Sequence, residues 1–550
     1  MSKNLSHLSF RKGMRENLFD KMGELAVSDG GTPTKEHLHQ LAKEFLMGDT
    51  NTYGAITAYD FMKPENQGKE IYVCNGSACL CAGTQDKVSE EISKHFDADQ
   101  IGHMTCLGRC HENSSFNYGG KNYSGDSINH LEKIISKKET SQNGKYNVTA
   151  AKEVLTEPFN DLETFRNLLE NVLSRSPEDI LQEIKDSEIR GRGGAGFPMG
   201  IKWEGCKNMV DEDKFIICNA DEGDPGAFSD RYLLEERPLA VIFGMMVAGY
   251  CTHANWGVPF IRAEYPEAIE ITENAIKDLY ANGLLGENIL NSGFTFNFKV
   301  IKAKGAYICG EETALINAIE GQRPEVRTRP PFPTQRGLFL KPTIVNNVET
   351  LASVPWIVKN GGKNYAAMGT EKSSGTKLIS LDGLFNKPGI VEVEMGTPLE
   401  KVINEFGGGF RKEVKALHIG GPLGGIVPVE KIKDLSIDFE TFAKEGFLLG
   451  HASIVCIPKD FPMIKYLEHL FDFAAFESCG KCFPCRLGTK RAHEMLEGAA
   501  NEMKPINKTL FEDLLNTLQQ GSLCAHGGGI PLPARNAMQY FKSELDLHFA

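Results

Sequence analysis

Three cysteines separated by two residues each lie in the stretch "FAAFESCGKCFPCRLGT". Cys479, Cys482 and Cys485 can each bind one corner of an iron–sulfur cubane, with a fourth ligand coming from a distant segment. Cys524, in the glycine-rich stretch "QQGSLCAHGGGIPLP", is the candidate for that ligand. Zinc sites more often use paired C-x2-C knuckles. The spacing therefore favours a [4Fe–4S] cluster over the two alternatives, a zinc site or unligated thiols.

A second group of cysteines lies near the N-terminus: Cys74 and Cys79 in "VCNGSACLCAG", and Cys106 and Cys110 in "MTCLGRCHE". Two pairs from two loops suit a [2Fe–2S] cluster, in which each pair holds one iron. A zinc site or two buried thiol pairs remain as alternatives, and the neighbouring Cys81 or His111 could replace one ligand. The isolated cysteines are expected to be small core residues; they are Cys206, Cys218, Cys251, Cys309 and Cys456.

Glycine-rich loops form the next group of chemical candidates. The stretch "RGRGGAGFPMGIKW" (190–203) can bring backbone N–H groups close to a phosphate, while Arg192 and Lys202 supply positive charge. It is neither a G-x-G-x-x-G motif after a strand nor a P-loop ending in GK[ST]. A glycine-rich surface loop without a ligand is therefore the alternative.

Acids and amides follow several predicted strands. They occur in "CNADEGDPGAFSDR" (218–231), in "YICGEETALINAIEG" (307–321), and in "VNNVET" (345–350). Acids at a helix start can simply complement the helix dipole. Amide and hydroxyl groups can instead hydrogen-bond the edge of a heterocycle. Together the three stretches place amide donors, phosphate-binding glycines and acids in one region.

The elements that position these residues divide the chain into segments. Strand, glycine loop and helix alternate in the middle of the chain, which is typical of an open α/β sheet that binds a cofactor at the carboxyl ends of its strands. Short strands between turns follow, and then a helical region. We predict a helical segment with a small cysteine-containing domain at 1–138, a linker at 139–154, an α/β domain at 155–372, a mixed domain at 373–452 and a helical domain at 453–550.

Composition restricts the function classes. The chain has 550 residues and a formal net charge of −13, which argues against a nucleic-acid partner because phosphate binding needs a basic face. The longest apolar run, 239–251, is too short to span a bilayer and follows Pro238, so we expect a buried helix and no membrane insertion. The start shows no signal peptide, and the fourteen cysteines predict reduced thiols in the cytoplasm.

Six segments in order resemble one family: "GRGGAGFP", "CNADEGDPGAF", "YICGEETAL", "PPFPTQRGLFLKPT", "VNNVETLA" and "ESCGKCFPCR…SLCA". The family is the NADH-binding flavoprotein subunit of respiratory complex I, with the diaphorase subunits of soluble NAD-dependent formate dehydrogenases and NAD-reducing hydrogenases. The first part of the chain, through "YGAITAYDF" and the C-x4-C…C-x3-C pattern, resembles the thioredoxin-like [2Fe–2S] subunit of the same module, fused in front.

The resemblance implies an α/β multidomain fold: a thioredoxin-like ferredoxin domain, a Rossmann-like FMN and NADH domain, a β-grasp-like (SLBB-type) domain and a C-terminal helical bundle with the [4Fe–4S] cluster. Carried over by position, the residues that contact FMN are Gly191, Arg192, Gly193, Lys202, Asn219, Asp221, Tyr307, Gly310, Glu311, Val345, Asn346, Asn347 and Thr350. Those expected to contact the dinucleotide are Phe197, Asp224, Glu312, Arg329 and Phe332.

The chain departs from the family at three of its positions. Asp224 stands where glutamate is common, Arg329 replaces a common lysine, and Glu204-Gly205 follow Trp203 where the family often has an aromatic residue. An acid near the adenosine ribose repels a 2′-phosphate, so we expect NAD(H) to be preferred over NADP(H).

The implied function is that of a diaphorase subunit. It transfers hydride between NAD(H) and FMN and single electrons between FMN and the iron–sulfur clusters, by positioning and without a catalytic acid or base. Glu312 is a candidate for tuning the site's charge. The expected partner is a molybdenum- or tungsten-containing formate dehydrogenase subunit or a hydrogenase subunit. The alternatives are the NADH-input subunit of complex I, an electron-bifurcating complex, and a non-catalytic iron–sulfur docking subunit.

Overall fold

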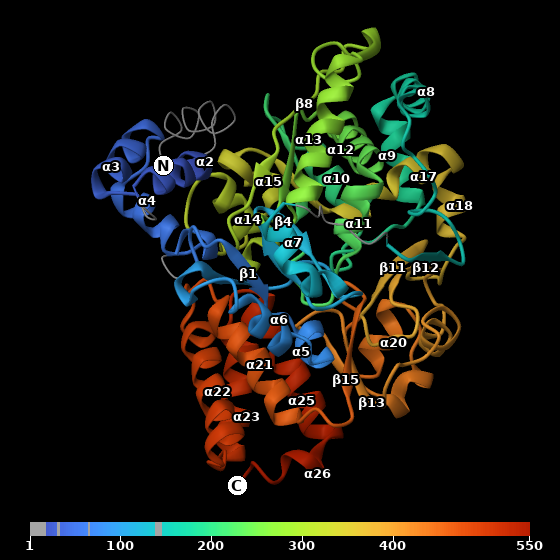
Figure 1. Cartoon of the computed structure of the whole chain (residues 1–550). Helices are drawn as coiled ribbons and strands as arrows, with labels where there is room; N and C mark the ends of the chain where they lie inside the picture. Colours follow the sequence, from blue (N-terminus) through green and yellow to red (C-terminus); the bar gives the residue numbers. More distant parts are fainter. Residues whose placement is uncertain (1–17, 30–32, 64–65, 138–145) are drawn as a thin grey trace.

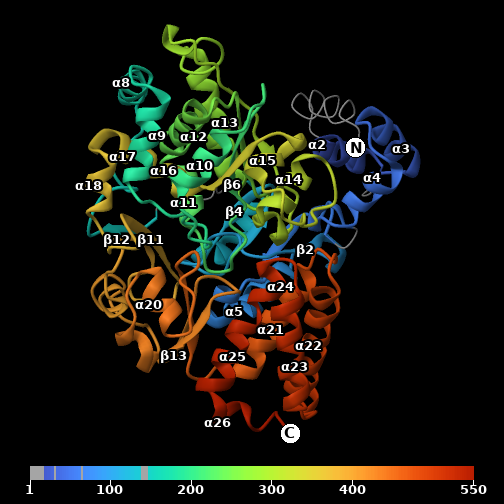
Figure 2. The ribbon, with the colours of Figure 1, turned by 180° about the vertical axis from the view of Figure 1, so that it is seen from behind.

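The computed structural model describes residues 18–29, 33–63, 66–137 and 146–550. It is a mixed α/β protein, and its described strands form three sheets. In Figures 1 and 2 the C-terminal helices lie at one end, and the small N-terminal sheet lies between them and the central α/β region. Part of the predicted linker 139–154 falls on residues outside the described ranges.

The N-terminal region combines helices with a four-stranded sheet. The helices are α2 (Leu18–Ser28), α3 (Lys35–Glu44), α4 (Asp49–Ile56), α5 (Ser77–Ala82), α6 (Gln85–Ile92) and α7 (Leu131–Ile135). The sheet has the order β2-β1-β3-β4, with β1 at Ile71–Cys74, β2 at Ile101–Met104, β3 at Phe116–Tyr118 and β4 at Lys121–Tyr123. Helices α2 to α4 pack with their apolar faces on the central sheet: Leu18 and Phe19 share a core with Phe215 and Val258. Both views show these helices beside α14 and α15.

A parallel sheet of order β10-β6-β7-β8, with β9 also paired to β7, forms the centre of the molecule. Its strands are β6 (Phe215–Ala220), β7 (Trp256–Ile261), β8 (Asn297–Phe298), β9 (Ile301–Lys302) and β10 (Thr343–Asn347). The surrounding helices are α8 (Leu162–Leu173), α9 (Pro177–Asp186), α10 (Met199–Lys207), α11 (Ser229–Glu236), α12 (Pro238–Thr252), α13 (Pro266–Ala281), α14 (Glu312–Ile319), α15 (Pro333–Arg336), α16 (Val348–Ala352), α17 (Val354–Asn360) and α18 (Gly362–Ala366).

The apolar run at 239–251 forms helix α12, with Pro238 at its first position. Its residues are buried almost all round, which explains why the sequence lacks the polar face of a surface helix. The prediction of a buried helix is confirmed. None of the described helices combines the length and apolarity that crossing a membrane requires.

A mixed sheet of order β14-β13-β15-β11-β12-β5 lies beside the central one. Its strands are β5 (Val148–Ala150), β11 (Thr376–Leu381), β12 (Gly389–Glu394), β13 (Val414–Ile419), β14 (Gly425–Pro428) and β15 (Ser453–Pro458), with the short helices α19 (Leu399–Lys401) and α20 (Phe439–Lys444). Two strands of this sheet come from outside the predicted 373–452 segment: β5 from the predicted linker and β15 from the start of the predicted helical domain.

Hydrogen bonds explain why these two strands join the mixed sheet. β5 pairs with β12 in parallel, and the buried Glu392 carboxylate accepts from the backbone N–H groups of Val154, Leu155 and Thr156 that follow β5. β15 lies between β13 and β11 in the middle of the sheet, and all of its residues are buried. Neither pairing has a local signal in the sequence.

The C-terminal region is helical: α21 (Met463–Phe476), α22 (Phe483–Glu502), α23 (Lys508–Gly521), α24 (Ala525–Gly529), α25 (Pro531–Tyr540) and α26 (Lys542–Leu545). α21 and α22 bury Leu467, Phe471 and Leu496 in a core shared with Phe511 of α23. The cysteine loops lie at the ends of these helices that face the rest of the molecule (Figures 1 and 2).

Candidate flavin, nicotinamide and iron–sulfur sites

Two candidate amides meet at the carboxyl edge of the central sheet. β6 and β10 pair in parallel, and their register places Asn219 opposite Asn347. Carboxyl ends of parallel strands are where open α/β sheets bind ligands. The glycine loop lies against the same edge, because a Cβ added at Gly193 would come 3.0 Å from the Cβ of Asn347. The Arg192 backbone N–H donates to the Thr350 hydroxyl at 2.9 Å, which fastens the loop to α16.

The Arg192 side chain is completely buried beside this loop. Its Nη2 donates to the Ser374 carbonyl at 2.5 Å and to the Tyr365 hydroxyl at 3.3 Å. Its Nε and Nη1 have no hydrogen-bond partner among the described residues. A buried guanidinium with unused donors is costly unless an anion satisfies it. The site therefore fits an anionic group such as a phosphate.

Helix α10 is fixed against β10 by side-chain contacts. The Lys202 ammonium donates to the Val345 carbonyl at 3.0 Å and lies 3.4 Å from a Glu312 carboxylate oxygen. The Trp203 indole N–H donates to the Asn346 side-chain oxygen at 2.9 Å. These contacts bring the candidate residues of α10, β10 and α14 to one place.

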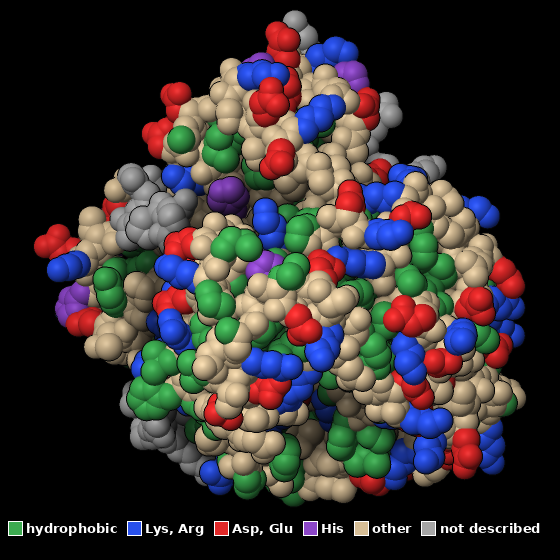
Figure 3. All heavy atoms as spheres, turned by 90° about the horizontal axis from the view of Figure 1, so that it is seen from below, with side chains coloured by type: hydrophobic (Ala, Val, Ile, Leu, Met, Phe, Trp, Pro, Cys, Tyr) green, Lys and Arg blue, Asp and Glu red, His purple; other side chains and the backbone are tan. Residues whose placement is uncertain are grey.

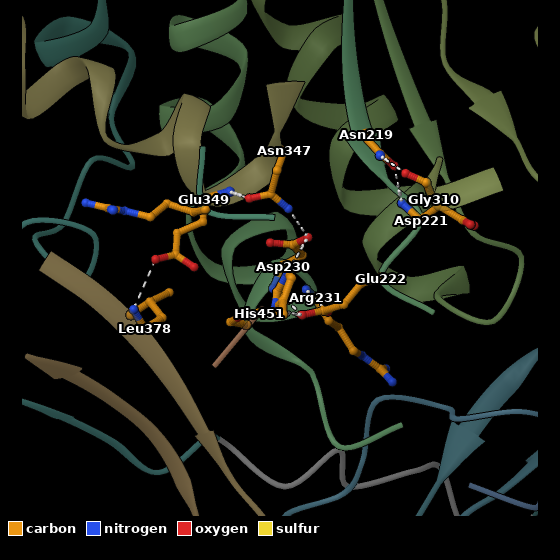
Figure 4. Close-up of polar contacts among 12 residues, drawn as sticks. Asn219, Asp221, Glu222, Asp230, Arg231, Gly310, Asn347, Glu349, Leu378 and His451 are labelled. Carbon is orange, nitrogen blue, oxygen red and sulfur yellow. Dashed lines mark hydrogen bonds and ion pairs between the residues drawn. The ribbon is translucent and has the colours of Figure 1, made fainter. Parts of the chain in front are cut away.

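Asn219 and Asp221 form the other side of the edge (Figure 4). The Asn219 amide donates to the Gly310 carbonyl at 2.8 Å and accepts from the Asp221 backbone N–H at 3.2 Å. A Cβ at Gly310 would lie 3.5 Å from the Asp221 carbonyl, so the two loops are in contact there. Burial raises the pKa of Asp221 well above its usual value. Its Oδ2 has no partner in the part of the chain that the structure describes, and a protonated carboxyl there can donate as well as accept.

Two acids at the start of α14 share one arginine. Glu311 caps the helix by accepting from the backbone N–H groups of Thr313 at 2.9 Å and Ala314 at 3.0 Å. The Arg329 guanidinium contacts Glu311 and lies 3.1 Å from Glu312. The predicted dinucleotide residues Glu312 and Arg329 are thus paired with each other.

Two candidate phenylalanines are exposed. The side chains of Phe197 and Phe332 are each 51% accessible, although large aromatic residues are usually buried. An aromatic face left open beside a charged edge offers a stacking surface to a planar ring. Phe197 lies in the loop before α10, which carries Lys202, and Phe332 lies in the loop before α15, which also contains Arg329.

Asp224 pairs with a predicted flavin residue. Its carboxylate accepts from the Tyr307 hydroxyl at 2.7 Å, and a Cβ added at Gly421 would collide with it. Burial raises the pKa of Asp224. The structure therefore packs this acid against the mixed sheet and ties it to Tyr307, a link that the sequence does not show.

Tyr307 also connects the edge of the sheet to the C-terminal helices. It begins the 3-10 turn η5 (Tyr307–Gly310). Its ring packs edge-on against Phe473, with centroids 5.0 Å apart, and at a tilt against His526, with centroids 5.7 Å apart. Its backbone N–H donates to the Glu477 carboxylate at 2.8 Å. The candidate flavin edge and the C-terminal cysteine loops are therefore in contact through one residue.

The four C-terminal cysteines converge. Cys482 is the N-cap of α22, Cys485 lies in its first turn, and Cys524 is the N-cap of α24. Burial is the main cause that raises the pKa of Cys485 to about 12; the nearby thiols of Cys482, Cys524 and Cys479 act in the same direction, and a hydrogen bond with Ser478 opposes them. Four clustered thiols become a stable set of thiolates when a metal supplies positive charge. The donor set fits a thiolate-bound cluster.

The four N-terminal cysteines also converge, in a more enclosed place. Cys74 ends β1, Cys79 lies on α5, and Cys106 and Cys110 follow β2. The Cys106 and Cys110 sulfurs are 3.3 Å apart, too far for a disulfide and close to the roughly 3.7 Å expected for two thiolates on one tetrahedral metal. All four are buried.

Other cysteines and His111 have different surroundings. Lys412 of the mixed sheet region donates to the Cys81 carbonyl at 3.4 Å, and burial followed by the Asp382 carboxylate raises the pKa of the Cys81 thiol. The His111 ring packs on Phe228 with centroids 4.7 Å apart. The isolated cysteines are buried, which confirms that they are core residues; they are Cys206, Cys218, Cys251, Cys309 and Cys456.

One cluster at this edge was missed by sequence reasoning. The imidazole of His451, from the loop before β15, lies between the carboxylates of Glu222 and Asp230, and Asp230 accepts from the Asn347 amide at 2.6 Å (Figure 4). His451 is more than two hundred residues from its partners, and no spacing motif links them.

Two family domains match the chain. Residues 184–356 match the Nuo51 FMN-binding domain, and residues 465–548 match the NADH-ubiquinone oxidoreductase-F iron–sulfur binding region. These matches cover the glycine loop, the carboxyl edge of the central sheet and the C-terminal cysteines.

Curated relatives extend the match. The NADP-reducing hydrogenase subunit HndC of Solidesulfovibrio fructosivorans is 42% identical over 388 residues, which cover 69% of this chain and 78% of that protein. An NADH-quinone oxidoreductase subunit of Rhizobium meliloti is 38% identical over 70% of this chain and 92% of its own length. The NAD-reducing hydrogenase HoxS subunit alpha of Cupriavidus necator is 38% identical over 68% of this chain and 61% of its own length.

A solved structure matches nearly the whole fold. A chain of an NAD+-reducing [NiFe]-hydrogenase in the H2-reduced state superimposes with a TM-score of 0.84 and 27% identity, covering 96% of this chain and 93% of that one. The protein therefore belongs to the family of NADH-binding flavoprotein subunits, with an FMN-binding domain and a [4Fe–4S] region, and is an NADH dehydrogenase of the diaphorase type.

Proposed function

We propose that this chain is the diaphorase subunit of an NAD-dependent formate dehydrogenase or hydrogenase type of complex. The proposal rests on how much of this chain each relative matches. The NADH-quinone oxidoreductase subunit of Rhizobium meliloti matches over 92% of its own length but only 70% of this chain, whereas the hydrogenase chain matches 96% of this chain. The additional N-terminal part is thus shared with the hydrogenase architecture. The NADH-input subunit of complex I is the second candidate, since the Rhizobium meliloti protein is 38% identical. An electron-bifurcating subunit is a third candidate, which rests on the motif segments alone.

The residues proposed to hold FMN form three sets. The loop Gly191, Arg192, Gly193 and the ammonium of Lys202 bind the phosphate; the unused buried donors of Arg192 fit an anion there. The side chains of Asn219, Asp221, Asn346, Asn347 and Thr350 orient the ring and its polyol chain. Tyr307, Gly310, Glu311 and Val345 close the site from η5 and β10.

The residues proposed for NAD(H) lie on the exposed side of the same edge. Phe197 and Phe332 present aromatic faces, and Arg329 and Glu312 form the ion pair next to them. Asp224 favours NAD(H) over NADP(H) by repelling a 2′-phosphate. HndC, which is 42% identical, is named an NADP-reducing subunit, so the preference of this chain for NAD(H) or NADP(H) needs to be measured.

Bound FMN supplies the conversion between hydride transfer and single-electron transfer. The chain supplies position: the glycine loop fixes the phosphate end, and the paired amides of β6 and β10 fix the ring end. We assign no acid or base, because catalysis by positioning needs none. Glu312 contacts both Lys202 and Arg329, so its charge affects both neighbouring cations.

The four C-terminal cysteines are proposed as the [4Fe–4S] ligands, and the four N-terminal cysteines as [2Fe–2S] ligands in a fused thioredoxin-like domain. The sheet order β2-β1-β3-β4 and the Cys106–Cys110 separation support the second assignment. The first two proposed units are the helical and [2Fe–2S] region to 138 and the flavin domain at 155–372. The β-grasp-like domain consists of 373–452 together with β5 and β15. The [4Fe–4S] helices begin after β15, from residue 459.

A partner surface is proposed beside the [4Fe–4S] ligands. Phe483 and Leu487 of α22 and Leu523 next to Cys524 are 68%, 58% and 50% exposed. Large apolar side chains around a cluster support a docking site for the next iron–sulfur or metalloprotein subunit.

Acidic and basic side chains are interspersed on the face in Figure 3, which shows no continuous basic surface for a nucleic acid. None of the fourteen cysteines, all of which lie in the described ranges, forms a disulfide, and we propose a cytoplasmic location, where thiols stay reduced.

The test is an anaerobic NADH titration of the purified chain, with FMN added, followed by visible absorbance and low-temperature EPR. We expect flavin bleaching together with distinct [4Fe–4S] and [2Fe–2S] signals, with dithionite used to reduce any cluster of low potential. A chain that binds clusters but no flavin would instead be the non-catalytic docking subunit. Copurification of a molybdenum, tungsten or nickel protein from native extract distinguishes the parent complexes.

A further inference from the structure

Three buried titratable side chains meet at the start of α11, outside the residues proposed to contact FMN or NAD(H). Glu222, Asp230 and His451 are 4%, 1% and 7% exposed. His451 Nε2 lies 3.3 Å from Asp230 Oδ2, and its Nδ1 lies 3.7 Å from Glu222 Oε1 and 3.4 Å from the Ser229 hydroxyl. The imidazole thus bridges two carboxylates and joins the loop before β15 to α11.

The Glu222 carboxylate is already saturated by donors. It accepts from the backbone N–H groups of Asp230 at 3.0 Å and Arg231 at 3.1 Å, and from the hydroxyls of Ser229 at 3.2 Å and Tyr265 at 3.0 Å. A carboxylate surrounded by N–H and O–H donors presents no free lone pairs to a metal ion. A protonated imidazole, which supplies both charge and hydrogen bonds, is the cation that this cluster fits.

The charges around His451 come from three elements. Burial alone would lower the pKa of His451. The charge of Asp230, its hydrogen bond to the imidazole and the charge of Glu222 have a larger effect in the other direction, so the pKa is raised to about 9. Lys377 of β11 acts in the opposite direction and is itself paired with Glu349. Burial raises the pKa of Glu222 to about 7. The imidazole is therefore charged at neutral pH.

The cluster is connected to the proposed flavin site through one amide. The Asn347 Nδ2 donates to Asp230 Oδ2 at 2.6 Å, while its Oδ1 accepts from the Glu349 backbone N–H at 3.0 Å as the N-cap of α16. Both ends of this amide are therefore fixed. Asn347 in turn lies against Gly193 of the glycine loop.

We propose that His451 is a positioning residue of the flavin site: its imidazolium holds the Asp230 carboxylate in place, and Asp230 holds the Asn347 amide against the glycine loop. The inference rests on the proposed FMN site. It assigns to the loop before β15, in the mixed sheet region, a direct effect on the flavin edge of the central sheet. It also makes flavin affinity depend on the charge of one histidine.

The test measures FMN affinity of the full chain by flavin fluorescence between pH 6.5 and 9. For the wild type we expect tight binding at pH 6.5 that weakens as the pH rises toward 9, because His451 loses its proton. For His451→Gln we expect binding about tenfold weaker already at pH 6.5, the size of one charge-assisted hydrogen bond, and without the further weakening toward pH 9 that the wild type shows. In the double variant His451→Gln/Asp230→Asn, removal of the unpaired charge should restore most of the affinity.

The matched control is His418→Gln. His418 is also buried in the mixed sheet, where it contacts the Tyr466 hydroxyl at 2.8 Å, but burial lowers its pKa to about 4, so it carries no charge at neutral pH. This variant should keep the affinity and the pH profile of the wild type.

The result that overturns the inference is a His451→Gln chain with the wild-type pH profile, whether its affinity is unchanged or uniformly reduced. A further readout does not depend on flavin. The unfolding midpoint of the FMN-free wild type should fall as the pH rises from 6.5 to 9, because the stabilisation from a raised histidine pKa is complete below the unfolded value and lost through the folded one. A wild type that shows this fall but binds no FMN would refute the proposed function and the positioning role, and leave only the ion cluster.

Discussion

The two cysteine sites differ in how the rest of the chain surrounds them. Cys74, Cys79, Cys106 and Cys110 are 0–3% exposed, whereas Cys479, Cys482 and Cys524 are partly accessible and have exposed apolar neighbours. The N-terminal cysteines lie at a contact between domains, whereas the C-terminal ones lie close to the surface, with only Cys485 among them buried. Only the C-terminal group therefore offers cysteine side chains for direct contact with another protein.

Arginines of the central domain hold the enclosed site in place. The Arg262 guanidinium donates to the Thr105 carbonyl at 2.8 Å and pairs with Glu264 at 2.7 Å, and Arg231 donates to the Leu107 carbonyl. These contacts flank Cys106 on both sides. At the C-terminal site, by contrast, Lys481 donates to the Val326 carbonyl at 2.6 Å, and Phe483 next to it stays exposed.

The largest expected effect comes from removing a surface ligand. Cys482→Ser should lower the iron content from about six to about two atoms per chain, because one missing thiolate destabilises the whole cubane. Electron delivery to the partner should be nearly abolished, while NADH reduction of a dye that reacts with flavin persists. Iron analysis and both assays check this. Cys456→Ser, at a buried core cysteine, is the control, and equal iron loss in both variants would contradict the ligand assignment.

Cys106→Ser tests the enclosed site in the same way. Iron should fall from about six to about four atoms per chain, with the [4Fe–4S] EPR signal retained. If this variant lost all six atoms, the two sites would not be independent.

In the wild type an iron chelator should remove the C-terminal iron before the N-terminal iron, because only the C-terminal cysteines are partly accessible. Loss of the N-terminal iron first would contradict the difference in burial between the two sites.

Arg262→Ala should reduce the free energy of unfolding by about 3–5 kcal/mol, the cost of leaving a buried partner charge such as Glu264 unpaired. Chemical denaturation with iron retention as a second signal measures it. The control is Arg491→Ala, which removes an exposed pair with Glu494 on α22 and should change stability by less than about 0.5 kcal/mol. Equal effects would show that burial does not distinguish the two regions.

Phe483→Ser should leave the fold and the iron content unchanged, since the side chain is mostly exposed, with a stability change within about 0.5 kcal/mol. Its effect should be on association, about tenfold weaker binding to the partner subunit, as expected for loss of one apolar anchor. Pull-down of the native complex or surface binding measures this. The matched variant Leu547→Ser, at an exposed residue near the C-terminus, should associate normally.

Local patterns predicted several features well. The buried helix α12 followed from an apolar run after a proline, and the alternation of strand, glycine loop and helix predicted the central α/β sheet. The FMN-binding and iron–sulfur regions followed from motif segments, which the family matches confirm. These are properties of contiguous stretches, where spacing alone fixes which backbone and side-chain groups lie together.

Other features had no local signal. β5 and β15 were placed in a linker and at the start of a helical domain, because a short strand is defined by the neighbour it pairs with and not by its own residues. The prediction that Asp224 lies near the ribose came from a motif, whereas its contacts with Tyr307 and Gly421 join distant parts of the chain and have no such signal.

The sequence by itself determined the chemistry available to this protein: eight cysteines at cluster spacing, a glycine loop with two cations, and acids after strands. The tertiary structure decided which of these groups meet. Parallel pairing of β6 with β10 brings Asn219 level with Asn347, and domain packing encloses one cysteine group while leaving the other at the surface. It also places His451 between two carboxylates. Such contacts depend on burial and long-range packing, and no spacing along the chain encodes them directly.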